Sequence, residues 1–338
     1  MKRKQLLSGL VTAIGVIGLV SFIVLKMPAY NLAGYGMTER TDGGYYTIVD
    51  ENNVPLLETG ILVTKGDEFI NWDDQFYEVT RVAGDIAYAR SADLAAVTGE
   101  AEGWESAGAL PVGVAVAAPG QPVVGIYHTH SDESYNPTSG RSSKPGKGDI
   151  FAVGGSLAQA MEQKGFNVIH DKSAHDPHDA AAYKRSRRTA ASLIKQQASI
   201  LIDVHRDSAP VKAYATKLNG QGASKVTLVV GRQNPKRSAN LAVARSIKAA
   251  ADKKYPGLFR SIFMARSSYN QDLGSQVILL EFGTNKQPLE APQRSTAAVA
   301  DVLASVFGAA PAPAAPAPPA QLPGAPGGTG NYVAPQDR

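Results

Sequence analysis

The chain has 338 residues, of which 43% are hydrophobic, 19% charged and 7% aromatic, and its formal charge is +4. The apolar fraction is normal for a globular core and excludes disorder of the whole chain, while the small positive excess does not indicate a nucleic-acid-binding protein. Cysteine is absent, which excludes disulfides, a thiolate zinc site and a cysteine nucleophile, so any metal must be bound by histidine and carboxylate side chains.

The N-terminus has the pattern of a membrane anchor. Positive residues at positions 2–4 precede an uncharged run, Leu6–Leu25, which Lys26 closes. A helix of this length measures about 30 Å, the thickness of the hydrocarbon core of a bilayer. Residues 1–27 are therefore predicted to be a cytoplasmic tip and a single transmembrane helix, with the bulk of the chain outside the cell. The alternative, a cleaved signal peptide, has a shorter apolar region of about 7–15 residues and a cleavage site that is missing here.

Residues 28–90 are predicted to form a small β-rich module without a catalytic grouping, because short alternating runs are separated by turn residues. The expected strands are Gly44–Val49, Gly60–Thr64, Asp67–Ile70, Phe76–Val82 and Asp85–Ala89. Residues 91–120 are rich in alanine and glycine, which predicts a linker.

Residues 121–309 show a different pattern, in which apolar runs typical of strands alternate with segments that have the apolar spacing of helices. The expected strands are Val123–Tyr127, Val168–His170, Ile200–His205, Val226–Val230 and Val277–Phe282. The expected helices are Gly148–Gly165, Ala180–Gln197, Ser238–Tyr255 and Ser295–Phe307. This alternation predicts an α/β domain with a mostly parallel sheet covered by helices. Residues 310–338 are rich in proline, alanine and glycine and are predicted to be a disordered tail.

Polar residues follow or end three of the apolar strands. His128 and His130 come after the first, His205 ends another, and Glu281 lies near the end of the last. Such strand ends can converge on one edge of a sheet. Imidazole and carboxylate ligands are typical of a catalytic zinc with one open position, and Glu281 could then act as the general base. Ordinary loop histidines, a structural ion-pair cluster around His205 and a strand-end carboxylate are the alternatives.

Five stretches of the chain resemble, in order, the stage II sporulation protein P family of endospore-forming bacteria. They are Ile126–Tyr135, Val168–Lys172, Ile202–Ser208, Tyr269–Leu273 and Ile278–Asn285. The N-terminal anchor and the β-rich module are also similar to those of the family, whereas the tail lies outside the resemblance.

The resemblance implies a zinc-dependent N-acetylmuramoyl-L-alanine amidase with the α/β fold of the zinc amidases. Such an enzyme cleaves the bond between N-acetylmuramic acid and the stem peptide, and the family is also credited with endopeptidase activity on cross-links. The implied setting is forespore engulfment, with the enzyme anchored in the cell membrane on the mother-cell side of the septum. The implied partners are peptidoglycan and the stage II sporulation proteins D and M, with no nucleic acid.

The resemblance also implies roles for particular residues. Glu281 resembles the catalytic glutamate, and the expected zinc ligands are His130, Glu133 and His205. His128 is the alternative to His130, and Asp149 the alternative to Glu133. Residues expected near the metal or the substrate are His128, His170, Asp171, Arg206 and Asp207.

A second class of function fits the same organisation. A membrane-anchored wall-binding scaffold with a non-catalytic amidase-like fold would also need the anchor, the module and the tail. Stoichiometric zinc would separate the two hypotheses, because a scaffold has little need of a metal.

A zinc peptidase acting on the wall would differ only in its product. A serine hydrolase is disfavoured, because no Gly-x-Ser-x-Gly turn accompanies the nearby serines.

Overall fold

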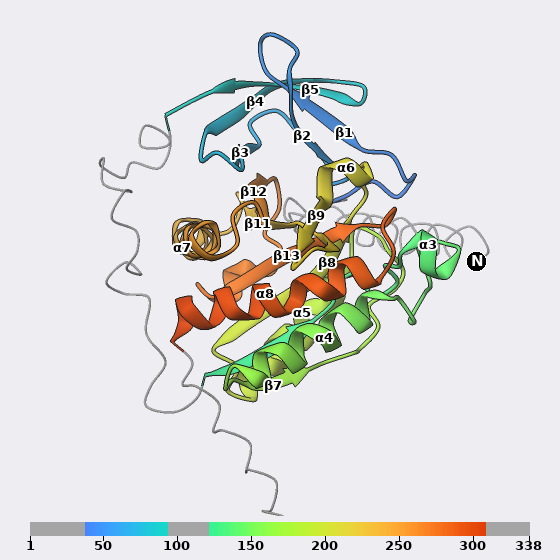
Figure 1. The fold of residues 1–338 in the computed structure, drawn as a ribbon, viewed down its shortest axis with the longest axis vertical. Coiled ribbons are helices and arrows are strands. Elements are labelled where there is room, and N and C mark those ends of the chain that lie inside the picture. Colours follow the sequence, from blue (N-terminus) through green and yellow to red (C-terminus); the bar gives the residue numbers. More distant parts are fainter. Residues whose placement is uncertain (1–37, 94–121, 309–338) are drawn as a thin grey trace, which may run out of the picture.

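The computed structural model of the chain describes residues 38–93 and 122–308 (Figure 1). The predicted anchor at 1–27, nearly all of the predicted linker at 91–120 and the predicted tail at 310–338 lie outside these ranges. Among the helices that are described, none has the length and hydropathy that crossing a bilayer requires. In the same ranges eleven strands form one sheet, in the order β2-β1-β5-β4-β3-β12-β11-β13-β8-β6-β7.

The first five strands match most of the predicted β-rich segment. They are β1 (Tyr46–Val49), β2 (Pro55–Thr59), β3 (Glu68–Ile70), β4 (Phe76–Ala83) and β5 (Ile86–Ser91). The strand predicted at 60–64 is wrong, because the chain turns between Asp50 and Val54, where the Asp50 backbone N–H donates to the Val54 carbonyl at 3.0 Å. This turn sets the register in which β2 pairs with β1, so that Ile61 makes only an isolated bridge with Glu39.

The second part of the chain contains every strand and helix predicted for it. The strands are β6 (Val123–Tyr127), β7 (Asn167–His170), β8 (Ile200–Asp207), β9 (Ala215–Leu218), β10 (Gln221–Ser224), β11 (Val226–Gly231), β12 (Phe259–Ala265) and β13 (Val277–Thr284). The helices are α3 (Asn136–Ser139), α4 (Ile150–Gln163), α5 (Ala182–Lys195), α6 (Val211–Tyr214), α7 (Arg237–Lys254), η3 (Gln271–Leu273) and α8 (Glu290–Phe307). Strand β12 and the hairpin β9–β10 were not predicted from the sequence.

The sheet is mixed, which corrects the prediction of a mostly parallel one. Strands β13, β8, β6 and β7 are parallel to one another, but β11 is antiparallel to β13, and β12 is antiparallel to β3. A parallel return needs a crossover of a dozen or more residues that is usually helical. The connection from β8 to β11 contains the four-residue α6 and the β9–β10 hairpin in place of a long crossover helix, and β11 runs antiparallel to its neighbour β13. Pairing of β3 with β12 then joins the β-rich segment to the same sheet.

The two faces of the sheet are covered by different helices. Val204 and Leu280 pack in the core cluster that includes the buried residues of α4, α7 and α8, and Figure 1 shows α4 and α8 lying side by side. The neighbouring residues Leu201 and Val277 pack instead with Leu193 of α5. Because side chains alternate along a strand, His205 and Glu281 belong to the α5 face.

Candidate metal centre

The carboxyl ends of three neighbouring strands bring the predicted chemistry together. Strands β6, β8 and β13 are parallel and adjacent, so their ends lie at one edge of the sheet. His205 of β8 is the direct register partner of Glu281 of β13. Tyr183 of α5 covers this corner, with its ring stacked on His205 at a centroid distance of 6.2 Å. His130, His205 and Glu281 therefore lie at the same edge of the sheet, as the strand pattern predicted.

A tight loop after β6 places the side chain of Glu133 at this edge. The backbone N–H of Gly148 donates to the Ser131 carbonyl at 3.0 Å, and that of Ile150 donates to the Glu133 carbonyl at 3.0 Å. The loop and the start of α4 thus lie against each other, and Glu133 is completely buried. Arg206 fixes its carboxylate, because the Arg206 backbone N–H donates to Oε2 at 2.8 Å.

Replacing Gly148 with alanine is expected to disturb this loop. The added Cβ would lie 2.5 Å from the Glu133 carbonyl oxygen and 2.6 Å from that of Ser131. Because both are backbone atoms, the clash can be relieved only by moving the chain. We expect a loss of about 1–3 kcal/mol in the free energy of unfolding, together with weaker metal binding.

The matched control for this prediction is Gly155→Ala in the middle of α4. Its Cβ would meet nothing closer than His170 Cε1 at 3.9 Å. This substitution is expected to stabilise the protein by about 0.5–1 kcal/mol, because alanine favours a helix more than glycine. Denaturant unfolding compares the two variants, and equal stability would contradict the proposed packing of the loop.

Four side chains form a compact group of potential metal ligands at this edge. Glu39, His130, Glu133 and His178 each offer one donor atom, and these atoms all lie within 4.8 Å of one another. His130 Nδ1 lies 3.3 Å from Glu133 Oε1 and directly against Glu39 Oε1. His178 Nε2 lies 3.4 Å from Glu39 Oε1. His205 borders the group, with Nδ1 3.4 Å from Glu133 Oε1.

The donor set fits a zinc ion. At a zinc–ligand distance of about 2.0–2.1 Å, the edges of a tetrahedral site measure roughly 3.3–3.4 Å, which matches the separations from Glu133 Oε1 to the nitrogens of His130 and His205. Among the described residues, His130 Nδ1 and His178 Nε2 are buried without a hydrogen-bond partner. A carboxylate lies on the far side of the His178 ring, where Asp132 is hydrogen-bonded to Nδ1 at 3.0 Å. Asp203 lies 3.0 Å from His205 Nε2 but without hydrogen-bond geometry. Hydrogen-bonded outer carboxylates orient the imidazole ligands of zinc.

Burial and neighbouring carboxylates both raise the pKa of Glu281, whereas at His178 and His205 the two effects oppose each other. Burial, together with the carboxylates of Asp207 and Glu133, raises the pKa of Glu281 well above its usual range. Burial disfavours the charged form of His178, but the carboxylates of Glu39 and Asp132 together outweigh it and raise the pKa of His178 to about 10. Asp203 and Glu133 likewise outweigh burial and raise the pKa of His205. A divalent cation would displace these imidazole protons, because only neutral imidazole binds a metal.

Several residues proposed from the sequence do not join the group. His128 Nδ1 contacts the Val204 carbonyl at 3.0 Å and Nε2 contacts His170 Nε2 at 2.9 Å, so both of its nitrogens are occupied. Asp171 Oδ1 accepts from the backbone N–H of Ser173 at 2.8 Å. The alternative ligand Asp149 is also outside the group, because its carboxylate accepts hydrogen bonds from Ser139 and Lys144. Asp207 accepts hydrogen bonds from the Gly60 backbone N–H at 2.6 Å and from the Tyr214 hydroxyl at 2.8 Å.

Two members of the group were missed from the sequence. His178 lies in the segment between β7 and α5, where histidine and aspartate also occur at 170–171 and 175–176, so only its pairing with Asp132 distinguishes it. Glu39 precedes β1, and no spacing relates it to residues so far along the chain. No sequence signal identified either residue.

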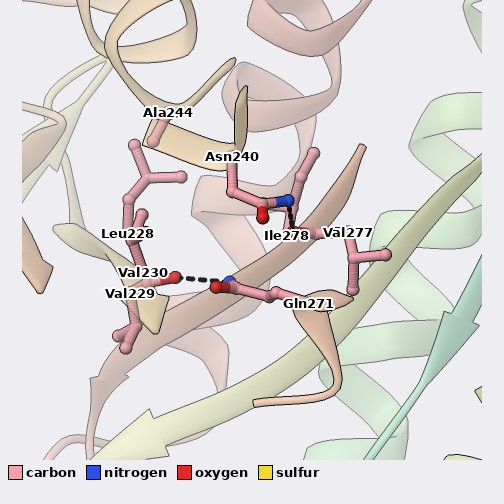
Figure 2. A pocket seen from close by; sticks show the side chains of 8 residues that line it. All are labelled: Leu228, Val229, Val230, Asn240, Ala244, Gln271, Val277 and Ile278. Atoms are coloured by element: carbon pink, nitrogen blue, oxygen red, sulfur yellow. Dashed lines mark hydrogen bonds between the residues drawn. The ribbon is translucent and has the colours of Figure 1, made fainter. Parts of the chain in front are cut away.

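A small pocket elsewhere in the fold is unrelated to this group. It lies among α7, β11, β13 and η3, and Figure 2 shows two amides closing it. Gln271 Nε2 donates to the Val229 carbonyl at 2.8 Å, and Asn240 Nδ2 donates to the carbonyl of Val277 at 3.5 Å. These contacts join α7 and η3 to the sheet, and none of the residues lining this pocket is a donor of the group described above.

Comparison with known proteins shows that most of the donor group lies in the part of the chain that a family model matches. A family model described as Stage II sporulation protein P matches residues 88–304. The curated Stage II sporulation protein P of Bacillus subtilis (strain 168) is 31% identical over 204 residues, which are 55% of this chain and 51% of that protein. The chain thus matches about half the length of this relative. Every member of the four-residue group except Glu39 lies inside the family match.

Solved structures are also similar to the chain, among them two amidases and a putative amidase. An N-acetylmuramoyl-L-alanine amidase from Clostridium difficile 630 is 14% identical and covers 56% of this chain and 94% of its own, with a TM-score of 0.35. A putative N-acetylmuramoyl-L-alanine amidase from Neisseria meningitidis is 15% identical, with coverages of 56% and 97% and a TM-score of 0.32. The CwlD amidase from Clostridioides difficile, in complex with the GerS lipoprotein, is 12% identical, with coverages of 56% and 99% and a TM-score of 0.32.

Proposed function

Because the chain belongs to the stage II sporulation protein P family, we propose that it is a zinc-dependent hydrolase of peptidoglycan. The bond cleaved is the amide between N-acetylmuramic acid and the stem peptide, and cross-link peptide bonds are a second substrate of the same site. One observation carries the proposal. A buried group of imidazole and carboxylate donors lies at the edge of the sheet where His205 and Glu281 are direct neighbours.

We assign the metal to His130, Glu133 and His205. Glu133 Oε1 faces both imidazoles, at 3.3 Å from His130 Nδ1 and 3.4 Å from His205 Nδ1. His205 is preferred over His178 because it adjoins Glu281 in the sheet, which keeps the ion beside the base. When bound, zinc would supply a Lewis acid that lowers the pKa of water and polarises the scissile carbonyl.

Glu281 is the proposed general base and acid. Its raised pKa makes the carboxylate a stronger base than a solvated glutamate, and its Oε2 is buried without a hydrogen-bond partner among the described residues. Glu281 takes one proton from the attacking water as the new C–O bond forms. It returns that proton to the amide nitrogen as the C–N bond breaks, so that a carboxylic acid and an amine leave.

The cellular setting proposed here rests on the family and on the sequence pattern. We propose that the enzyme acts during forespore engulfment, together with the stage II sporulation proteins D and M. The positively flanked apolar run at Leu6–Leu25 supports a single-pass anchor in the cell membrane, with the bulk of the chain outside the cytoplasm on the mother-cell side of the septum.

The proposal is tested by incubating the purified full chain with purified peptidoglycan. Zinc content is measured on the same sample, and released fragments are identified by mass spectrometry. We expect about one zinc per chain and free stem peptides that disappear when a chelator is added. Zinc without cleavage, even after the stage II sporulation protein D is added, would contradict the proposed reaction. Neither zinc nor cleavage in a folded sample would favour the wall-binding scaffold.

A further inference from the structure

Glu39 reaches the metal centre from outside the domain that holds the other donors. It lies just before β1, and backbone hydrogen bonds attach its neighbours to the segment after β2. The Arg40 N–H donates to the Gly60 carbonyl at 2.8 Å, and the Leu62 N–H donates to the Thr38 carbonyl at 2.8 Å. These two hydrogen bonds form the isolated bridge that pairs Glu39 with Ile61. A short segment therefore carries this carboxylate, whereas His130, Glu133 and His205 lie on the main sheet or on the loop that follows β6.

The Glu39 carboxylate is directed at the donors and is nearly enclosed. Oε1 contacts His130 Nδ1 directly and lies 3.4 Å from His178 Nε2, while Oε2 lies 3.8 Å from Arg206 Nη1. The Glu39 side chain is 10% exposed. Neither imidazole nitrogen has a hydrogen-bond partner among the described residues, so these contacts do not have hydrogen-bond geometry. One oxygen of Glu39 therefore lies against two imidazole nitrogens of the donor group.

A carboxylate in this place completes a closed coordination set. Catalytic zinc sites keep one position open beside three protein ligands, whereas four protein ligands are typical of closed, structural sites. With His130, Glu133 and His205 as three ligands, Glu39 supplies the fourth. The position it occupies is then the one that water or the carbonyl oxygen of a substrate would need.

We propose that Glu39 is a displaceable fourth ligand of the metal, which closes the site until a substrate carbonyl takes its place. This inference rests on the proposed metal site. Of the four donors, Glu39 is the one on a short segment outside the α/β strands, because the backbone hydrogen bonds of its neighbours to Gly60 and Leu62 and the ion pairs of Arg40 with Asp42 and Asp85 all lie within the β-rich segment. Movement of the segment next to β2 thus controls access to the metal.

The test compares Glu39→Gln with the wild type after loading the full chain with Co²⁺ in place of zinc. Acetohydroxamate is the probe, because it binds metals through a carbonyl and a hydroxamate oxygen. We expect the visible absorption of Co²⁺ to change on substitution, and acetohydroxamate to bind at least tenfold more tightly to the variant. The variant should also hydrolyse peptidoglycan at least as fast as the wild type, because the open position is no longer occupied.

Glu58→Gln is the matched control. Glu58 is also a partly buried carboxylate of the N-terminal segment, and it contacts Lys212 at 3.5 Å and Arg260 at 3.8 Å away from the donor group. Its variant should keep the wild-type Co²⁺ spectrum and acetohydroxamate affinity. If wild type and Glu39→Gln have the same Co²⁺ spectrum and the same affinity for acetohydroxamate, Glu39 is not a ligand, but the assignment of the metal site is unaffected. Failure of the wild-type chain to bind Co²⁺ would overturn the metal site itself, and the present inference with it.

Discussion

Glu281→Gln is expected to lower the rate of peptidoglycan hydrolysis by roughly 10²–10⁴-fold, the contribution of a well-placed general base. The amide of glutamine has nearly the shape of the carboxylate but cannot accept the proton of the attacking water. Glu281 is buried, and the carboxylates of Asp207 and Glu133 lie close enough to raise its pKa. Removing its charge relieves this repulsion, so the free energy of unfolding should not fall. The measurement is the rate of stem-peptide release together with zinc content.

The control is Glu162→Gln, the same chemical change on the exposed face of α4. This variant should retain the full rate. Zinc content should equal that of the wild type in both variants, because Glu281 is not among the proposed ligands. Turnover by Glu281→Gln within a few-fold of the wild type would remove Glu281 from the mechanism, and lost zinc would make it a ligand instead.

His205→Asn is expected to weaken zinc binding by more than about 100-fold, beyond the loss that follows removal of an outer hydrogen-bond partner of a ligand. His178→Asn is expected to weaken it by roughly 10–100-fold, the loss typical of a group that supports a ligand, because in the proposed site this ring contacts Glu39 and Asp132. Competition with a chromogenic chelator measures both affinities. Unfolding curves of the metal-free proteins verify that each variant is folded.

The reverse order of affinities would assign the second imidazole ligand to His178. That outcome has a structural basis of its own, because His178 belongs to the compact four-residue group and His205 only borders it. Equal losses in both variants would indicate that the ion lies between the two rings. Either result would retain His130 and Glu133 and would revise the position of the metal relative to Glu281.

Most regular elements of the α/β part were predictable, because each of the predicted strands is a mainly apolar run. Val277–Phe282 and Ile200–His205 are examples, and both are found as parts of β13 and β8. Strand β12 escaped prediction because Arg260 and Ser261 interrupt its apolar run, and both are buried in the fold. Arg260 is tolerated there because its guanidinium donates to the Glu58 carbonyl oxygen at 2.9 Å.

The sequence by itself determined which side chains the chemistry can use and where the strands that present them end. Histidine and carboxylate are the donors available without cysteine, and His130, Glu133, His205 and Glu281 follow or end apolar strands. Only the tertiary structure decided that the sheet is mixed and that the β-rich segment joins it through β3 and β12. Only the tertiary structure brought Glu39 to His130 and placed His128 against His170. Periodicity records which face of its own element a residue occupies, whereas contacts between distant segments depend on how the elements pack together.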